Sequence, residues 1–515
     1  MTETKDNEHW TPAAKMLHGP AIAETRMPLP VAFATARTAR KKAGLALWME
    51  RVLEECDRTG VDFAADPVHD LRVALRRCRS MADGLRVMDP HPAWKEMRRA
   101  GKRLFSQLGE LRDVHVMEEW VHRLGDPDDP VTRTLVQFLA GRESHLKQHA
   151  ALALQELDRK KWRRWITFLP RRAAKIRTGS PLFKHLALER WTEAYELHRR
   201  ALRNRSPLAF HQLRIGLKRF RYIAENFLPE QHSAWAHDLK ELQDLLGEVH
   251  DLDVLWATAL QVNAFPNAES RSSWHSRILE ERTQRIEKYR GKMRGKTSLW
   301  QTWRAELPAG KQIESGALGR LKLWASLLDP DFKHAIHVAR LALQLYDGLQ
   351  RPANSEQRSI LQVAALLHDI GRSKNEKAHH KAAYDLIRKL TPPLSWSEEK
   401  MRWVGIVSRY HRGTLPRVGQ KTLAGLTPAQ RQDILRLAGI LRLANALDSD
   451  RNGRIQRLEV HDHNGFLMIA AQGYSARARM AEKVAAARHL LETVSRRPVI
   501  LKPLRINKPK PEIKS

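Results

Sequence analysis

Cysteine, acidic residues and long apolar runs are all scarce in this 515-residue sequence. The two cysteines, Cys56 and Cys78, are too few for a disulfide framework or a thiolate metal cluster, so we expect each to be a small buried residue. No run of about 18 apolar residues is present to span a bilayer. The N-terminal residues also lack the apolar segment of a signal peptide. These absences predict a cytoplasmic protein without membrane insertion.

The shortage of acid sets the charge of the chain. It has 58 Asp and Glu residues against 90 Lys and Arg residues, a formal net charge of +32 at pH 7. Such a balance predicts an anionic partner, and charge alone leaves nucleic acid, an acidic membrane surface and polyphosphate open. The hydrophobic content of 42% is typical of a folded protein, and the length allows two or three domains.

One segment of the sequence occurs twice. The first copy, VHDLRVALRRCRS, spans residues 68–80, and the second, FHQLRIGLKRFRY, spans residues 210–222. A second repeated segment follows each copy: LGELRDVHVM at 108–117 and LGEVHDLDVL at 246–255. The repetition predicts that about half of the protein is one unit used twice.

Each copy has the period of an amphipathic helix. At about 100° per residue, the basic residues of a copy share one face and its leucines lie opposite. Arginine presents a planar donor fork that matches phosphate oxygens, so phosphate is the expected ligand. The alternative is that the basic row is only the solvated side of the helix. The candidate anion-binding residues are His69, Arg72, Arg76, Arg77, Arg79, His211, Arg214, Lys218, Arg219, Arg221 and Tyr222.

Both copies resemble the signature helix of the CHAD family, named for a histidine-containing α-helical domain, and the resemblance spans residues 31–307. It implies two similar antiparallel helical bundles, at about 31–165 and 180–307, around a basic central groove. It also implies binding of inorganic polyphosphate. From the residues themselves we expect Asp113 and Asp251 each to anchor a signature arginine by a charge-assisted hydrogen bond.

Other features of the first half remain predictions of local structure. Asp66 and Pro67 are expected as N-cap and first residue of the first signature helix. The pattern at 94–121 predicts one continuous helix, and residues 1–30 a loosely ordered leader. The basic stretch at 160–177 could extend the anion site, bind nucleic acid or connect the two bundles.

The sequence changes character at about residue 318. An amphipathic helix is predicted at 333–349, and an apolar helix at 360–373 contains His368 and Asp369. An imidazole and a carboxylate together, with a histidine on a neighbouring helix, form a ligand set suited to Zn²⁺, Mn²⁺, Fe²⁺ or Mg²⁺. Such a metal suits the hydrolysis of phosphoesters or phosphoanhydrides.

With HHK at 379–381, YH at 410–411 and LRLANALD at 441–448, this module resembles the HD phosphohydrolase superfamily. The nearest likeness is to the C-terminal region of the exopolyphosphatase and guanosine pentaphosphatase family, without that family's ATP-binding lobes. The resemblance implies that a divalent metal is held by His334, His368, Asp369 and Asn445, the last in place of the usual aspartate. Asp448, three residues further on, could partly substitute for the missing carboxylate. His379, His380 and His411 could form the outer part of an anion or second-metal site.

An amide is a weaker ligand than a carboxylate, so Asn445 lowers the expected metal affinity. The alternative is a catalytically inactive HD fold in which these histidines are core residues. We expect this all-helical module to span 318–500, with a small α+β tail that contains a β-hairpin at 454–471. A basic disordered tail is predicted at 501–515.

The sequence therefore predicts a mainly α-helical protein that binds polyphosphate and carries an HD-type domain able to hydrolyse phosphoanhydride or phosphoester bonds. Such a protein could associate with polyphosphate granules. The alternative is a basic nucleic-acid-binding protein with an inactive HD scaffold. Single-strand binders interleave aromatic residues for base stacking, and only Phe220 and Tyr222 lie among the signature charges. The sequence leaves the oligomeric state open.

Overall fold

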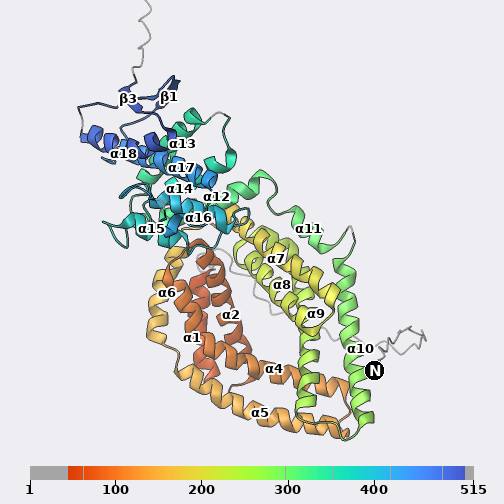
Figure 1. The fold of residues 1–515 in the computed structure, drawn as a ribbon. Coiled ribbons are helices and arrows are strands. Elements are labelled where there is room, and N and C mark those ends of the chain that lie inside the picture. Colours follow the sequence, from red (N-terminus) through yellow and green to blue (C-terminus); the bar gives the residue numbers. More distant parts are fainter. Residues whose placement is uncertain are drawn as a thin grey trace, which may run out of the picture. The chain divides into compact units, whose positions relative to one another are not determined.

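A computed structural model describes residues 44–504 except 62, 296, 351, 418 and 478. The leader expected at 1–30 lies outside the described residues, as do residues 505–515 of the tail expected at 501–515. The start of that tail is wrong, because residues 501–503 belong to the strand Val499–Pro503. The described chain is mainly α-helical, with a small sheet near its C-terminal end (Figure 1). The predicted fold class is thus confirmed. Over the described residues, no helix is both long enough and apolar enough for a membrane crossing.

Two consecutive sets of helices build the first part of the chain. The first set comprises α1 (Leu45–Thr59), α2 (Ala65–Met88), α3 (Pro92–Ala100), α4 (Lys102–Leu124), α5 (Pro130–Gln155) and α6 (Arg159–Ala173). The second comprises α7 (Pro181–Asn204), α8 (Pro207–Phe227), α9 (Pro229–Gln261), α10 (Ala268–Met293) and α11 (Leu299–Ala305).

The repeated segments form α2 and α8, and these two helices pack against each other. A β-carbon at Gly84 of α2 would overlap the Phe227 ring at the end of α8, so glycine permits this close approach. The leucines predicted to lie opposite the charges are buried in one shared core, with Leu71 and Leu75 on α2 and Leu213 and Leu217 on α8. Packing of the apolar sides into this core therefore determines the directions in which the two basic faces point.

Two local predictions are wrong. Helix α2 begins at Ala65 after Ala64, so Asp66 and Pro67 lie inside its first turn instead of capping it. The helix expected at 94–121 is divided at Gly101 into α3 and α4. Glycine is a poor helix former because it loses the most backbone freedom on ordering, and this outweighs the continuous apolar period.

The second part of the chain has its own apolar core, which extends from Leu321 to Val499. Its sheet has the order β1 (Leu458–His463), β2 (Phe466–Ala471), β3 (Val499–Pro503), with β1 antiparallel to β2 and β2 parallel to β3. The β1–β2 turn pairs His463 with Phe466 and places Gly465 at φ +98°, which favours glycine. In chain order, the elements of this second part are α12 (Lys311–Leu328), α13 (Phe332–Leu349), α14 (Ser355–Leu367), α15 (His379–Ile387), α16 (Glu398–Arg409), a 3₁₀ turn (Lys421–Leu423), α17 (Pro428–Leu447), β1 (Leu458–His463), β2 (Phe466–Ala471), α18 (Arg479–Ser495) and β3 (Val499–Pro503).

Candidate functional site

The basic faces of α2 and α8 meet at four residues, Arg72, Arg76, Arg214 and Lys218, which we call the cationic cluster. Burial and the charges of the three arginines together lower the pKa of the Lys218 ammonium to about 7, and Asp251 opposes this shift. Tyr222 lies close enough to this cluster to be influenced by its charges. Burial raises the pKa of Tyr222, and the charges of Arg76 and Arg214 oppose that rise. Five of the predicted residues are therefore brought together.

The positive charges of this cluster have no acidic partners at contact distance. In the part of the chain that the structure describes, no carboxylate oxygen lies within 4.0 Å of any of the four, whereas nearby Arg77 and Arg221 both reach Glu225. Arg72 donates to the Leu108 carbonyl at 2.8 Å, and Nε of Arg214 is buried without a hydrogen-bond partner. Gathering unpaired cations is unfavourable, so the arrangement suits a site whose counter-charge comes from a ligand.

Arg77 has a different role from the one the sequence suggested. It forms an ion pair with Glu225 at 2.5 Å, and its guanidinium lies over the Trp48 ring. Asn226 next to this glutamate donates to the Ser80 hydroxyl at 3.0 Å. These contacts join α2 to α8, so Arg77 clamps the two helices together.

The other predicted residues lie away from the cationic cluster or on its margin. Arg79 donates to the Arg98 carbonyl at 2.6 Å, and Arg221 lies 3.9 Å from Glu225. Nδ1 of His211 is 3.3 Å from Nδ1 of His250, and burial lowers the pKa of both rings. The side chains of His69 and Arg219 are exposed.

The expected anchoring by Asp113 and Asp251 is wrong. Neither carboxylate is hydrogen-bonded to a signature arginine in the described chain, because Arg72 uses the Leu108 carbonyl one turn before Asp113. Asp113 is exposed and influences Arg72 only through space. Burial raises the pKa of Asp251 to about 6, and Arg214 opposes that rise.

A cleft of about 450 Å³ opens beside the cationic cluster, between α4, α8 and α9. Arg214 and Lys218 line it from α8, and Asp251 lines it from α9. Arg112 and Arg123 of α4 add two further basic residues, which sequence reasoning missed, but each is paired with a glutamate, and Glu119, Asp244 and Glu248 also line the cleft. Arg112 directly precedes Asp113 in the second repeated element, which is the signal that could have identified it.

The second candidate site contains His368, Asp369, His379 and His411, which we call the histidine cluster. In each of its three imidazoles, Nδ1 lies 2.7 Å from the backbone carbonyl three residues earlier, as a donor would. This fixes the tautomer and leaves Nε2 with its lone pair. All three Nε2 atoms face Oδ1 of Asp369, at 3.5 Å for His368, 3.1 Å for His379 and 3.8 Å for His411.

This arrangement fits a divalent metal. The Nε2 atoms of His379 and His411 are only 3.3 Å apart, and two facing lone pairs repel unless a proton or a cation lies between them. Nε2 of His368 is buried and makes no hydrogen bond. Burial lowers the pKa of the His368 and His411 imidazoles, which favours the neutral, ligating form. A ring nitrogen bonded to a backbone carbonyl is also the usual outer support of a metal-bound histidine.

Asp369 divides its two oxygens between different partners. Oδ1 faces the imidazoles, and Oδ2 accepts from Arg451 at 2.5 Å. Burial raises the pKa of this carboxyl, but the hydrogen bond from Arg451 opposes that rise, and the pKa stays well below its usual range. Asp369 is therefore an anionic ligand whose free oxygen points into the histidine cluster.

His334 is close to the histidine cluster, but both of its ring nitrogens already have hydrogen-bond partners. Nδ1 lies 2.7 Å from Asp448 Oδ2, and Nε2 lies 3.0 Å from Asn445 Oδ1. A metal could reach Nε2 only by displacing Asn445, and Asp448 stands behind the ring as an orienting group. His334, His368 and Asp369 still lie within mutual ligand distance. His380 does not line the pocket that contains His379 and His411.

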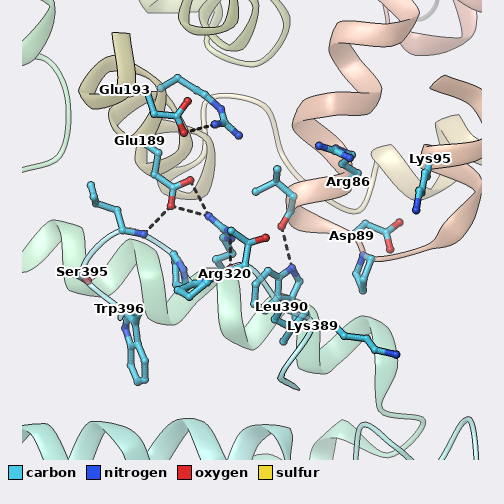
Figure 2. Close-up of a pocket in the computed structure, with 18 of the residues that line it drawn as sticks. Arg86, Asp89, Lys95, Glu189, Glu193, Arg320, Lys389, Leu390, Ser395 and Trp396 are labelled. Carbon is cyan, nitrogen blue, oxygen red and sulfur yellow. Dashed lines mark hydrogen bonds and ion pairs between the residues drawn. The ribbon is translucent and has the colours of Figure 1, made fainter. Parts of the chain in front are cut away.

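A larger pocket of about 830 Å³ lies where α7 and α12 meet residues 389–396 (Figure 2). Figure 2 shows Glu189 directed at Arg320, which donates to it at 2.8 and 3.0 Å. Asp89 accepts two bonds from Arg172, at 2.6 and 2.7 Å. Because its buried charges are paired, this pocket has no comparable demand for a charged ligand.

The described chain is thus mainly helical, with a cluster of basic residues between α2 and α8 and a separate group of buried histidines around Asp369. Residues 45–260 match the family model of the CHAD domain, and residues 324–483 match the model described as Ppx/GppA phosphatase, domain III. The chain thus carries a CHAD domain followed by a Ppx/GppA-type domain III, which confirms the suspected fusion. No curated protein matches the chain.

Proposed function

We propose that this protein binds inorganic polyphosphate at the cationic cluster and hydrolyses phosphorus–oxygen bonds at the histidine cluster. The observation that carries the binding half is that no carboxylate oxygen lies within 4.0 Å of Arg72, Arg76, Arg214 or Lys218 in the described chain. A chain of phosphates supplies repeated negative charge to a row of donors on two rigid helices. The CHAD match and the Ppx/GppA match both support a role connected with polyphosphate.

Polyphosphate fits the cationic cluster better than nucleic acid does. Single-stranded nucleic acids are bound by exposed aromatic rings on which bases stack. Two rings next to this cluster, Tyr222 and Phe105, are half-buried, and the Arg72 guanidinium already lies over Phe105. A polymer without bases needs only the phosphate contacts that the cluster supplies.

Nucleic acid remains a second candidate partner, at α6. Its outer face carries exposed basic residues without a carboxylate within 4.0 Å in the described chain, and Phe168 beside them is 38% exposed. This combination of charge and an open ring is what a single strand requires. The basic residues are Lys160, Arg163, Arg164 and Arg171.

For hydrolysis, the divalent metal would be held by Nε2 of His368, His379 and His411 and by Oδ1 of Asp369. When bound, such a metal lowers the pKa of a water and polarises a phosphoryl oxygen. The residues of the chain do the remaining work: the backbone carbonyls orient the three rings, and Arg451 keeps Asp369 ionised. Three nitrogens and one oxygen suit Zn²⁺, Fe²⁺ or Mn²⁺.

Binding of defined-length polyphosphate to the full chain tests the first half. We expect the variant Arg72→Ala/Arg76→Ala/Arg214→Ala/Lys218→Ala to lose most of the affinity, and unchanged affinity would refute the assignment. Competition with RNA separates the two partners, since RNA bound at α6 should not displace polyphosphate from the cationic cluster.

Elemental analysis tests the second half. Purified protein should contain a transition metal that His368→Ala loses, and the loaded protein should hydrolyse polyphosphate. Protein that binds no metal after incubation with Zn²⁺, Fe²⁺ or Mn²⁺ and releases no phosphate would reduce this domain to a scaffold.

A further inference from the structure

The pocket over the histidine cluster has a volume of about 460 Å³ and a strongly basic lining. His379, His411 and Asn445 lie in it, and Glu376 is the carboxylate among its described lining residues. Five cations surround that single acid: Arg372, Arg412, Arg442, Arg451 and Lys483. None of these five entered the sequence-based site.

Three of the five cations have acidic partners. Arg372 lies 3.3 Å from Glu376, Arg451 bridges Asp331 and Asp369, and Lys483 lies 3.5 Å from Asp450. Their charges are therefore already used to hold the protein together. Arg412 and Arg442, which we call the arginine pair, have no carboxylate within 4.0 Å in the described chain.

The chain holds Arg442 in place, whereas the side chain of Arg412 is exposed. Arg442 donates to the Gly413 carbonyl at 2.7 Å and is 3.5 Å from the Tyr410 carbonyl, so neutral acceptors hold its guanidinium without cancelling its charge. Burial lowers the pKa of Arg442, and the charge of Arg412 lowers it further. The two guanidinium groups are therefore close enough for their charges to repel each other. Two like charges that line one pocket, neither of them with a carboxylate within 4.0 Å in the described chain, suit an anion that bridges them.

The elements that carry the arginine pair also carry the histidine cluster and its neighbours. Arg412 directly follows His411, and Arg442 lies three residues before Asn445 on the same side of α17. The opposite wall is formed by Ala486 and Ala487 of α18, whose small side chains leave the pocket open. A ligand at the histidine cluster can therefore extend to the arginine pair within one pocket.

We infer that the substrate of this centre is a phosphoanhydride, with the reacting phosphate at the histidine cluster and the neighbouring phosphate bound by Arg412 and Arg442. This inference rests on the proposed hydrolase function and names its substrate class. A phosphomonoester has a single phosphate and would leave the arginine pair without a ligand. A phosphoanhydride supplies two adjacent phosphates, which matches the two sets of groups.

The same geometry explains how the pair would assist the reaction. The oxygen of water bonds to the reacting phosphorus, and the bond from that phosphorus to the bridging oxygen breaks. The electron pair leaves with the bridging oxygen on the neighbouring phosphate, and one proton of the water passes to solvent or to that phosphate. The leaving phosphate gains negative charge at the place where the arginine pair donates, which lowers the barrier.

The test compares the full chain with its variant Arg412→Gln/Arg442→Gln, both in a background carrying Arg76→Ala/Lys218→Ala so that short anions are not held by the cationic cluster. The matched control is Arg417→Gln/Arg457→Gln, two exposed arginines outside the pocket. Calorimetry with methylenediphosphonate, a diphosphate that cannot be hydrolysed, should show at least about tenfold weaker binding in the pair variant. Binding of inorganic phosphate should change by less than about threefold in the same variant.

Kinetics completes the test. With metal bound, kcat/KM for tripolyphosphate should fall at least about tenfold in the pair variant and stay near the parent value in the control. Equal losses for diphosphate and phosphate, or no loss for either, overturn the inference. Hydrolysis of p-nitrophenyl phosphate that is as fast as that of tripolyphosphate and indifferent to the arginine pair overturns it while leaving a hydrolase. Absence of all hydrolysis by metal-loaded protein overturns the proposed hydrolase function itself.

Discussion

Removing the cationic cluster should reduce the salt dependence of polyphosphate binding by a definite amount. The perturbation is Arg72→Gln/Arg76→Gln/Arg214→Gln/Lys218→Gln, which keeps side-chain length and removes four charges. Each cation that neutralises a phosphate releases a condensed counterion, and for a single-stranded polyanion the slope of log K against log salt is about −0.7 per contact. Four contacts then account for a slope change of roughly 3.

The protonation of Lys218 refines this magnitude. Because its pKa is lowered to about 7, this side chain is half charged at pH 7 in the free protein and largely charged at pH 6. The slope difference between parent and variant should therefore be larger at pH 6 than at pH 8. Titrations at several KCl concentrations, with polyphosphate of one length and fluorescence or calorimetric detection, measure it directly.

A matched control removes four charges that the structure places in ion pairs. Arg103, Arg199, Arg358 and Arg497 each contact a carboxylate, and none belongs to the cationic cluster. Changing these four to Gln lowers the net charge equally. If both variants lose the same slope, binding follows the +32 net charge and the reasoning about unpaired cations is refuted.

Three further outcomes are expected. Polyphosphate affinity should rise as pH falls from about 8 to 6, because Lys218 gains its proton and Asp251, with its pKa raised to about 6, begins to lose its charge; Lys218→Met should flatten most of this profile in binding titrations. His379→Ala should lower the bound metal, measured by elemental analysis, by at least about tenfold, whereas Asn445→Ala should leave it near the parent value. Asp89→Ala should lower the free energy of unfolding in urea by about 3 kcal/mol, because it leaves Arg172 without its bidentate partner; a loss under about 1 kcal/mol would contradict that buried pair.

Features with a short period along the chain could be predicted from the sequence. The apolar sides of α2 and α8 follow from helical spacing, and the turn of the β-hairpin follows from Asn464-Gly465, because both depend on residues only a few positions apart. The division at Gly101 shows the limit of this reasoning. One residue with a high cost in a helix interrupts a pattern that the surrounding apolar residues continue.

The candidate sites depend on contacts that the sequence does not encode locally. Arg72 and Lys218 come together only because two repeats pack their apolar sides into one core. The two arginines of the pair are 30 positions apart in the sequence. They come close because Arg442 donates to the carbonyl of Gly413, the residue after Arg412. The sequence shows which side chains stand at these positions, but it does not show how far each lies from an acidic partner. That distance is what distinguishes Arg77 from Arg76.

Asparagine in place of an aspartate at position 445 does not argue against the proposed metal site. The sequence comparison assigned the first ligand to His334, and the structure engages both nitrogens of that ring with Asn445 and Asp448. The lone pairs that remain free belong instead to His368, His379 and His411, which converge on Oδ1 of Asp369. An uncharged residue at 445 is then consistent with a centre displaced toward α15 and α16, where the carboxylate at 445 is not required.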